Sequence, residues 1–130
     1  MSPSAAASTR ILIADDHAIV RDGLRRIIES APGFAVAGEA VDGTEVIARA
    51  REGGFDLLLL DMSMPGRSGI DLIKQVKIEQ PKLPILVLSM HAEEQYAVRA
   101  IRAGASGYLT KDTASSLLVE ALRKVAGGGM

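Results

Sequence analysis

Short apolar runs recur along the chain, and most of them stop abruptly at a polar residue. The clearest is Phe55–Leu60, which contains four consecutive leucines and is followed directly by Asp61. A run this short, apolar at successive positions instead of alternate ones, is typical of a strand covered on both faces. Between such runs, apolar residues recur at helical spacing, as Val20, Leu24 and Ile28 do. Strands that alternate with helices predict right-handed crossovers and a parallel sheet with helices on both faces.

Five strands and five helices follow from this pattern. The predicted strands are Arg10–Ala14, Phe34–Glu39, Phe55–Leu60, Ile85–Leu88 and Ser106–Leu109. The first predicted helix ends before Ala31-Pro32-Gly33, and the second runs from Asp42-Gly43 to about Gly53. The third includes Leu72–Val76, the fourth spans Ala92–Ala103, and the fifth includes Leu118–Val125. Five units favour an open sheet, since a closed barrel needs about eight. We therefore predict an α/β fold with a doubly wound, flavodoxin-like, five-stranded parallel sheet in the strand order 2-1-3-4-5.

Length and composition point to one compact domain without disulfides. The chain has 130 residues, of which 48% are hydrophobic, only 3% are aromatic and none is cysteine, so we expect a core of aliphatic side chains. The formal net charge of -1 argues against nucleic-acid binding by this chain itself. The sequence contains no recognisable secretory signal and no apolar run of membrane-spanning length, so we expect a cytoplasmic protein that does not bind membranes. We expect residues 1–9 to form a flexible tail, residues 10–126 the domain, and residues 127–130 a linker or second tail.

Polar residues gather at one end of the predicted sheet. Asp15 and Asp16 follow the first strand, Asp61 the third, Ser89 the fourth and Lys111 the fifth. In a parallel sheet these carboxyl ends share one edge, which is where open α/β sheets bind ligands. The sequence therefore predicts that residues nearly a hundred positions apart converge on one site.

The chemistry of these side chains favours phosphoryl transfer. Three carboxylates in one pocket repel one another unless a cation is present, and oxygen ligands suit Mg²⁺. Lys111 adds a positive charge, and the Ser89 hydroxyl can donate a hydrogen bond. Phosphoryl transfer depends mainly on positioning and charge neutralisation, and an aspartate can serve as its nucleophile.

Three stretches resemble the receiver domains of bacterial two-component response regulators, most closely the NarL/FixJ (LuxR-type) subfamily. They are ILIADDHAIVRDGLRRIIE at 11–29, DLLLLDMSMPGRSGIDLI at 56–73 and PILVLSMHAEEQYAVRAIRAGASGYLTKD at 84–112. The resemblance implies that Asp61 is the phosphoacceptor. It also implies that Asp16, Asp61 and the main-chain carbonyl of Ser63 bind Mg²⁺ (or Mn²⁺) directly, while Asp15 acts mostly through a bound water.

The same resemblance implies a conformational switch. Lys111 would pair with the Asp61 carboxylate and then with the phosphoryl oxygens, Ser89 would move to hydrogen-bond the phosphoryl group, and Tyr108 would turn inward. Asp112 follows Lys111 where many receivers have a proline, so no cis peptide bond is expected there.

The resemblance also implies partners. The phosphoryl donor would be a phosphohistidine on a sensor histidine kinase, and phosphorylation would favour a homodimer. The chain would be a signalling switch that catalyses only its own phosphorylation and dephosphorylation. Members of the subfamily continue into a helix-turn-helix DNA-binding domain that controls transcription, which implies a receiver fragment or a single-domain relative here.

Other interpretations remain open at this stage. Asp15 and Asp16 could simply cap the following helix, because aspartate favours helix N-termini. His17 and His91 lie near the same edge, and we expect exposed positions for both, without ligand roles. A metal-dependent hydrolase with a transient phosphoenzyme at Asp61, or a flavin-binding module of the same topology, are the rival functions.

Overall fold

A computed structural model describes residues 8–62, 64, 68–89 and 94–127. Strands and helices alternate along this part of the chain, as the sequence predicts. The elements are β1 (Thr9–Ala14), α2 (Ala18–Ser30), β2 (Phe34–Ala40), α3 (Gly43–Glu52), β3 (Leu57–Asp61), α4 (Gly69–Glu79), β4 (Ile85–Ser89), α5 (Glu94–Ala103), β5 (Gly107–Thr110) and α6 (Lys111–Ala126).

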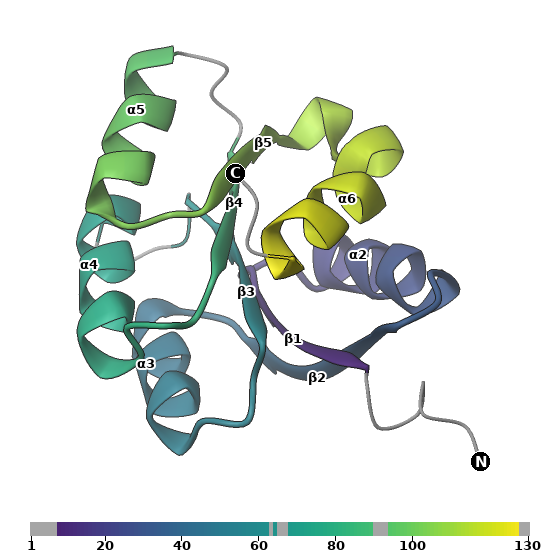
Figure 1. Ribbon diagram of the computed structural model, residues 1–130, viewed down its shortest axis with the longest axis horizontal. Helices are drawn as coiled ribbons and strands as arrows, with labels where there is room; N and C mark the ends of the chain where they lie inside the picture. Colours follow the sequence, from purple (N-terminus) through teal and green to yellow (C-terminus); the bar gives the residue numbers. More distant parts are fainter. Residues whose placement is uncertain (1–7, 63, 65–67, 90–93, 128–130) are drawn as a thin grey trace.

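The five strands form one sheet in the order β2-β1-β3-β4-β5, and every neighbouring pair is parallel. This confirms the predicted doubly wound, flavodoxin-like topology. Figure 1 shows the sheet between two layers of helices, with α2 and α6 on one side and α3, α4 and α5 on the other. The strand order reverses between β1 and β3, so ligands are expected at the carboxyl ends of these two strands.

The sheet separates two hydrophobic clusters because side chains alternate along each strand. Leu58 and Leu60 of β3 belong to the cluster under α3, α4 and α5, whereas Leu57 and Leu59 belong to the cluster under α2 and α6. All four leucines are buried, which explains why the strand reads as an unbroken apolar run.

Several elements differ from the predicted ones at their ends. β1 begins at Thr9, whose amide donates to the Gly33 carbonyl, and β3 runs to Asp61 instead of ending at Leu60. Asp61 is still paired with Leu88 of β4, so the ladder of hydrogen bonds extends past the last apolar residue. Ladder partners set the end of a strand, and they are not visible in the strand's own sequence.

Two further findings concern the helices, and a third concerns the peptide bonds. α5 ends at Ala103, and Gly104 directly after it adopts a φ of 124° that only glycine adopts readily; a Cβ there would lie 2.8 Å from Lys77 Cγ. Among the described residues, no helix has both the length and the apolar character needed to cross a membrane. The described peptide bonds contain no cis isomer.

Candidate functional site

The carboxyl edge of the sheet brings the predicted polar residues together. Asp15 follows β1, Asp61 and Ser89 are the last residues of β3 and β4, and Lys111 is the first residue of α6, directly after β5. The strand registers align these ends, with Ala14 opposite Leu60 and Ser89 opposite Thr110. The predicted convergence is confirmed, since Lys111 contacts Asp15 across 96 positions of sequence.

Two carboxylates lie deep in this edge. Asp15 is 0% and Asp61 2% exposed, and Asp16 is more accessible. The Asp15 main chain is fixed by its amide, which donates to the Ala40 carbonyl of β2 at 3.0 Å. Its side chain accepts from the His17 amide at 2.8 Å, so the carboxylate is held in one orientation. Buried charges of one sign need a cationic partner, because the protein interior screens them poorly.

Lys111 supplies part of that positive charge. Its Nζ lies 3.3 Å from Asp15 Oδ2 and 3.2 Å from Asp61 Oδ1. Burial alone would lower the pKa of the Lys111 ammonium, but the charges and hydrogen bonds of Asp61 and Asp15 together outweigh burial and raise that pKa. The ammonium therefore stays protonated between the two buried carboxylates.

Asp15 and Asp16 do not cap α2. The N-cap residue is His17, and its side chain makes no capping hydrogen bond. The capping alternative is therefore wrong, and the acidic pair is left available for another role. By contrast, Asp42 and Ser68 do cap α3 and α4 through hydrogen bonds to backbone amides.

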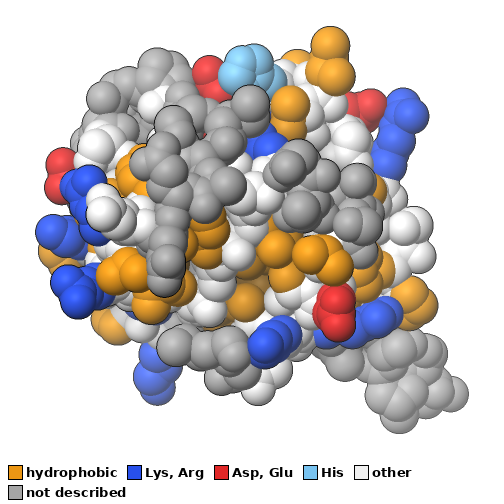
Figure 2. Space-filling view, turned by 90° about the horizontal axis from the view of Figure 1, so that it is seen from above, with side chains coloured by type: hydrophobic (Ala, Val, Ile, Leu, Met, Phe, Trp, Pro, Cys, Tyr) orange, Lys and Arg blue, Asp and Glu red, His pale blue; other side chains and the backbone are white. Residues whose placement is uncertain are grey.

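His17 is exposed as predicted, but its ring contacts the acidic pair, which sequence reasoning missed. The His17 Nδ1 atom lies 3.3 Å from Asp15 Oδ1 and 3.1 Å from Asp16 Oδ1, contacts that become ion pairs only when the imidazole is protonated. Figure 2, which views the molecule from above, shows a histidine side chain beside an acidic one on this face. The signal that could have revealed the contact is adjacency, because His17 directly follows two aspartates.

The site has the composition of a hard-cation centre. One potential ligand atom from each of Asp15, Asp16, His17 and Asp61 lies within 4.8 Å of the others. The Asp16 Oδ1 atom is buried and accepts no hydrogen bond of suitable geometry from the described residues. Converging carboxylate oxygens, one of them without a hydrogen-bond donor among the described residues, fit Mg²⁺ or Mn²⁺, which bind oxygen ligands.

The remaining predicted residues flank this centre. Ser89 is buried at the end of β4, one strand away from Asp61. Tyr108 is partly buried and packs against the hydrophobic cluster under α3, α4 and α5. Ser63 and His91 lie outside the described residues, so the predicted carbonyl ligand and the exposed histidine stay predictions.

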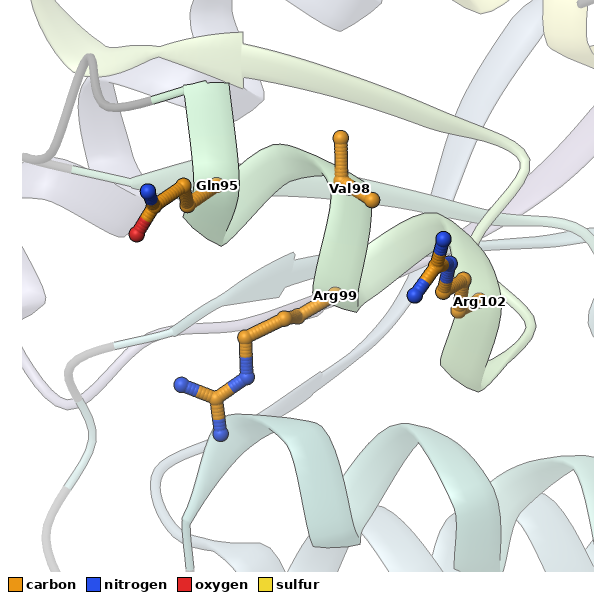
Figure 3. Close-up of a pocket in the computed structure, with 4 residues that line it drawn as sticks. All are labelled: Gln95, Val98, Arg99 and Arg102. Atoms are coloured by element: carbon orange, nitrogen blue, oxygen red, sulfur yellow. The ribbon is translucent and has the colours of Figure 1, made fainter.

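A surface hollow on α5 is separate from the acidic centre. It has a volume of about 360 Å³ and is lined by Gln95, Val98, Arg99 and Arg102. Figure 3 shows that all four side chains leave the same helix. Among the described residues, none of the acidic ones at the carboxyl edge lines this hollow, so the carboxyl edge remains the candidate functional site.

Comparison with known proteins places this geometry in a family. The family model "Response regulator receiver domain" matches residues 11–123. The chain is 40% identical over 119 residues to YxjL, an uncharacterised transcriptional regulatory protein of Bacillus subtilis (strain 168), and 37% identical over 118 residues to the response regulator UvrY of Escherichia coli (strain K12). These alignments cover 92% and 91% of this chain but only 55% and 54% of the relatives, so the chain spans about half their length.

A solved structure agrees with the sequence matches. The crystal structure of a LuxR-family two-component response regulator from Aurantimonas sp. SI85-9A1 is 38% identical and superposes with a TM-score of 0.90. The match covers 94% of this chain and 87% of that one. On these grounds, together with the parallel sheet and its acidic carboxyl edge, the chain belongs to the response regulator receiver domain family.

Proposed function

We propose that Asp61 accepts a phosphoryl group in a Mg²⁺-dependent reaction, and that the modified carboxylate switches the conformation of the domain. The observation that carries the proposal is the buried Asp61 carboxylate at the switch point of the sheet, with the Lys111 ammonium 3.2 Å away and two further aspartates beside it. This set supplies a nucleophile, a cation and metal ligands in one place.

Asp15, Asp16 and Asp61 would hold the metal, and the carbonyl of Ser63 completes the proposed ligand set. Mn²⁺ would bind to the same oxygen atoms. The ion supplies neutralisation of the charge that develops on the phosphoryl oxygens. The fit rests on the converging carboxylate oxygens described above.

The chain's own residues carry the remaining steps. A carboxylate oxygen of Asp61 attacks phosphorus, the bond from phosphorus to the donor breaks, and the donor leaves with the bonding electron pair. Lys111 pairs with the Asp61 carboxylate beforehand and with the phosphoryl oxygens afterwards, so its charge is matched at both stages. Water later attacks the phosphorus of the same acyl phosphate, the bond from phosphorus to the Asp61 oxygen breaks, and inorganic phosphate leaves as the carboxylate is restored. The domain thereby catalyses its own dephosphorylation.

The switch depends on residues beside the acceptor. A phosphoryl group adds roughly −1.5 to −2 charges and strong acceptor oxygens, which favour the state with Ser89 and Tyr108 drawn inward. Shifting a population from 1:99 to 99:1 requires about 5.5 kcal/mol of differential binding. Charge-assisted hydrogen bonds to the phosphoryl group are of sufficient strength to contribute much of this. The face formed by α5, β5 and α6 then changes shape.

The proposed partners are those that the resemblance to the family implies. The donor is a phosphohistidine of a sensor histidine kinase, and the phosphorylated domain associates into a homodimer. In a longer parent protein, a DNA-binding domain converts this signal into control of transcription. The names of the relatives, a transcriptional regulatory protein and a response regulator, support this output.

The test is the intact mass of the protein after incubation with acetyl phosphate, with and without Mg²⁺. We expect a gain of one phosphoryl group that requires Mg²⁺ and is lost in Asp61→Asn. A matched control is Asp56→Asn. Asp56 is exposed and directly precedes β3, at the end of the strand opposite to Asp61, so its replacement should leave the gain of phosphoryl mass intact. No gain in the wild type would contradict the proposal, and steady phosphate release without accumulation would favour the hydrolase instead.

A further inference from the structure

An arginine outside the acidic centre is tied to the segment that carries the metal-binding pair. The Arg21 side chain on α2 is only 16% exposed. Its Nη1 donates to the main-chain carbonyl of Asp15 at 2.7 Å, and its backbone amide donates to the carbonyl of His17 at 3.0 Å. One residue therefore holds both ends of the three-residue segment Asp15–His17.

The Asp15 carbonyl matters because of peptide geometry. The carbonyl of Asp15, the amide of Asp16 and the Asp16 Cα lie in one planar unit, so fixing the carbonyl also restrains the position of the Cα from which the Asp16 side chain leaves the main chain. The Asp15 amide is already held by Ala40 of β2. With Arg21 on the other side, the peptide units before and after Asp15 are both restrained.

Glu39 of β2 orients the arginine in turn. Glu39 Oε1 accepts from Arg21 Nε at 2.8 Å, and its other carboxylate oxygen contacts Arg25. A guanidinium can bridge two acceptors because its donors form a rigid planar fork, which a lysine lacks. Glu39 also compensates the charge of Arg21, which would otherwise oppose a cation at the neighbouring site.

We infer that Arg21 is a positioning residue for the metal centre, acting through the Asp15 carbonyl and oriented by Glu39. The inference rests on the proposed function, because it assumes that Asp15 and Asp16 bind a divalent cation. Groups that orient metal ligands without touching the metal typically contribute 10- to 100-fold in affinity. Arg21 and Glu39 should therefore set the concentration of Mg²⁺ that the domain requires, and not the chemistry at Asp61.

The experiment measures Mn²⁺ binding directly, by the loss of the free-ion electron paramagnetic resonance signal on titration. We expect Arg21→Met to raise the Kd at least about tenfold. Arg21→Lys should fall between Arg21→Met and the wild type, because an ammonium keeps the charge but not the fork. Glu39→Gln should weaken binding in the same direction. The control is Arg26→Met on the same helix, whose exposed side chain pairs only with Asp22 among the contacts described, and it should keep the wild-type Kd.

A kinetic measurement separates positioning from loss of structure. With acetyl phosphate as donor, Arg21→Met should need more Mg²⁺ for half-maximal phosphorylation, while its maximal rate at saturating Mg²⁺ stays within a factor of about three. Wild-type Mn²⁺ affinity in Arg21→Met, with only a lower Tm, would overturn the inference and leave the proposed function standing. If Arg21→Met does not fold, wild-type affinity in both Arg21→Lys and Glu39→Gln would overturn it. No Mn²⁺ binding by the wild type would instead refute the metal site itself.

Discussion

At the scale of single residues, Lys111 is coupled directly to the acceptor. Its ammonium contacts one oxygen of Asp15 and one of Asp61, and both aspartates are almost fully buried. Replacing only the cation would remove that positive partner from two buried carboxylates, and a buried charge that loses its counter-charge is costly.

Lys111→Met should therefore lower the free energy of unfolding, measured by urea denaturation without Mg²⁺ at neutral pH, by about 1–3 kcal/mol. The pKa of Lys111 is raised in the folded state, so protonated Lys111 stabilises the fold below the ordinary lysine pKa of about 10.4, and this stabilisation is lost as pH rises through the higher folded-state pKa. The difference between wild type and Lys111→Met should shrink above about pH 10.4. A difference that stays constant at higher pH would show that Lys111 acts through packing alone.

At the scale of elements, two helical glycines should respond to alanine with opposite signs. A Cβ on Gly23 of α2 would meet no atom within 4 Å, whereas on Gly69, the first residue of α4, it would lie 2.5 Å from Met62 Sδ and 3.2 Å from Met62 Cα. We expect Gly23→Ala to raise the free energy of unfolding by about 0.5–1 kcal/mol and Gly69→Ala to lower it by about 1–3 kcal/mol.

Urea denaturation of both variants tests this expectation. In a Met62→Ala background the cost of Gly69→Ala should fall, because the thioether that blocks the Cβ is gone, and a double-mutant cycle measures that coupling. Equal effects of the two glycine substitutions would mean that helix propensity, and not the contact with Met62, decides the outcome.

The elements themselves could be read from the sequence because each buried strand is a short apolar run. Leu57–Leu60 is apolar throughout since alternate leucines enter opposite clusters. The strand ends could not be read in the same way, as Asp61 and Thr110 show. Both are polar, yet their pairing with Leu88 and Ser89 keeps them in the ladder.

The part of the site that depends on sheet topology could be predicted from the sequence. A parallel sheet requires the ends of β1, β3, β4 and β5 to share an edge, so Asp15, Asp61, Ser89 and Lys111 had to converge. The Arg21–Glu39 contact was not predicted. Its sequence signal is that Glu39 is the one charged residue of the β2 strand, but only the packing of α2 beside β2 shows that Arg21 meets it.

For the whole molecule, the metal site and global stability should be linked. The acidic centre is assembled from the ends of separate strands, so the unfolded chain does not contain it. A ligand that binds only the folded state stabilises it by RT ln(1 + [L]/Kd), or about 2.7 kcal/mol at a hundred times the Kd. We expect Mg²⁺ at a hundred times its Kd to raise the free energy of unfolding by about 2.7 kcal/mol, measured by urea denaturation at constant ionic strength.

Asp16→Asn supplies the variant that separates this linkage from a general salt effect. It removes a proposed ligand and should abolish the Mg²⁺-dependent increment. Without Mg²⁺ it should be more stable than the wild type by about 1 kcal/mol, because it relieves repulsion among clustered carboxylates. Asp56→Asn, at the far end of β3, should keep the full increment. If Mg²⁺ stabilised Asp16→Asn as much as the wild type, the ion would be acting elsewhere on the molecule, and the clustered carboxylates would need another explanation.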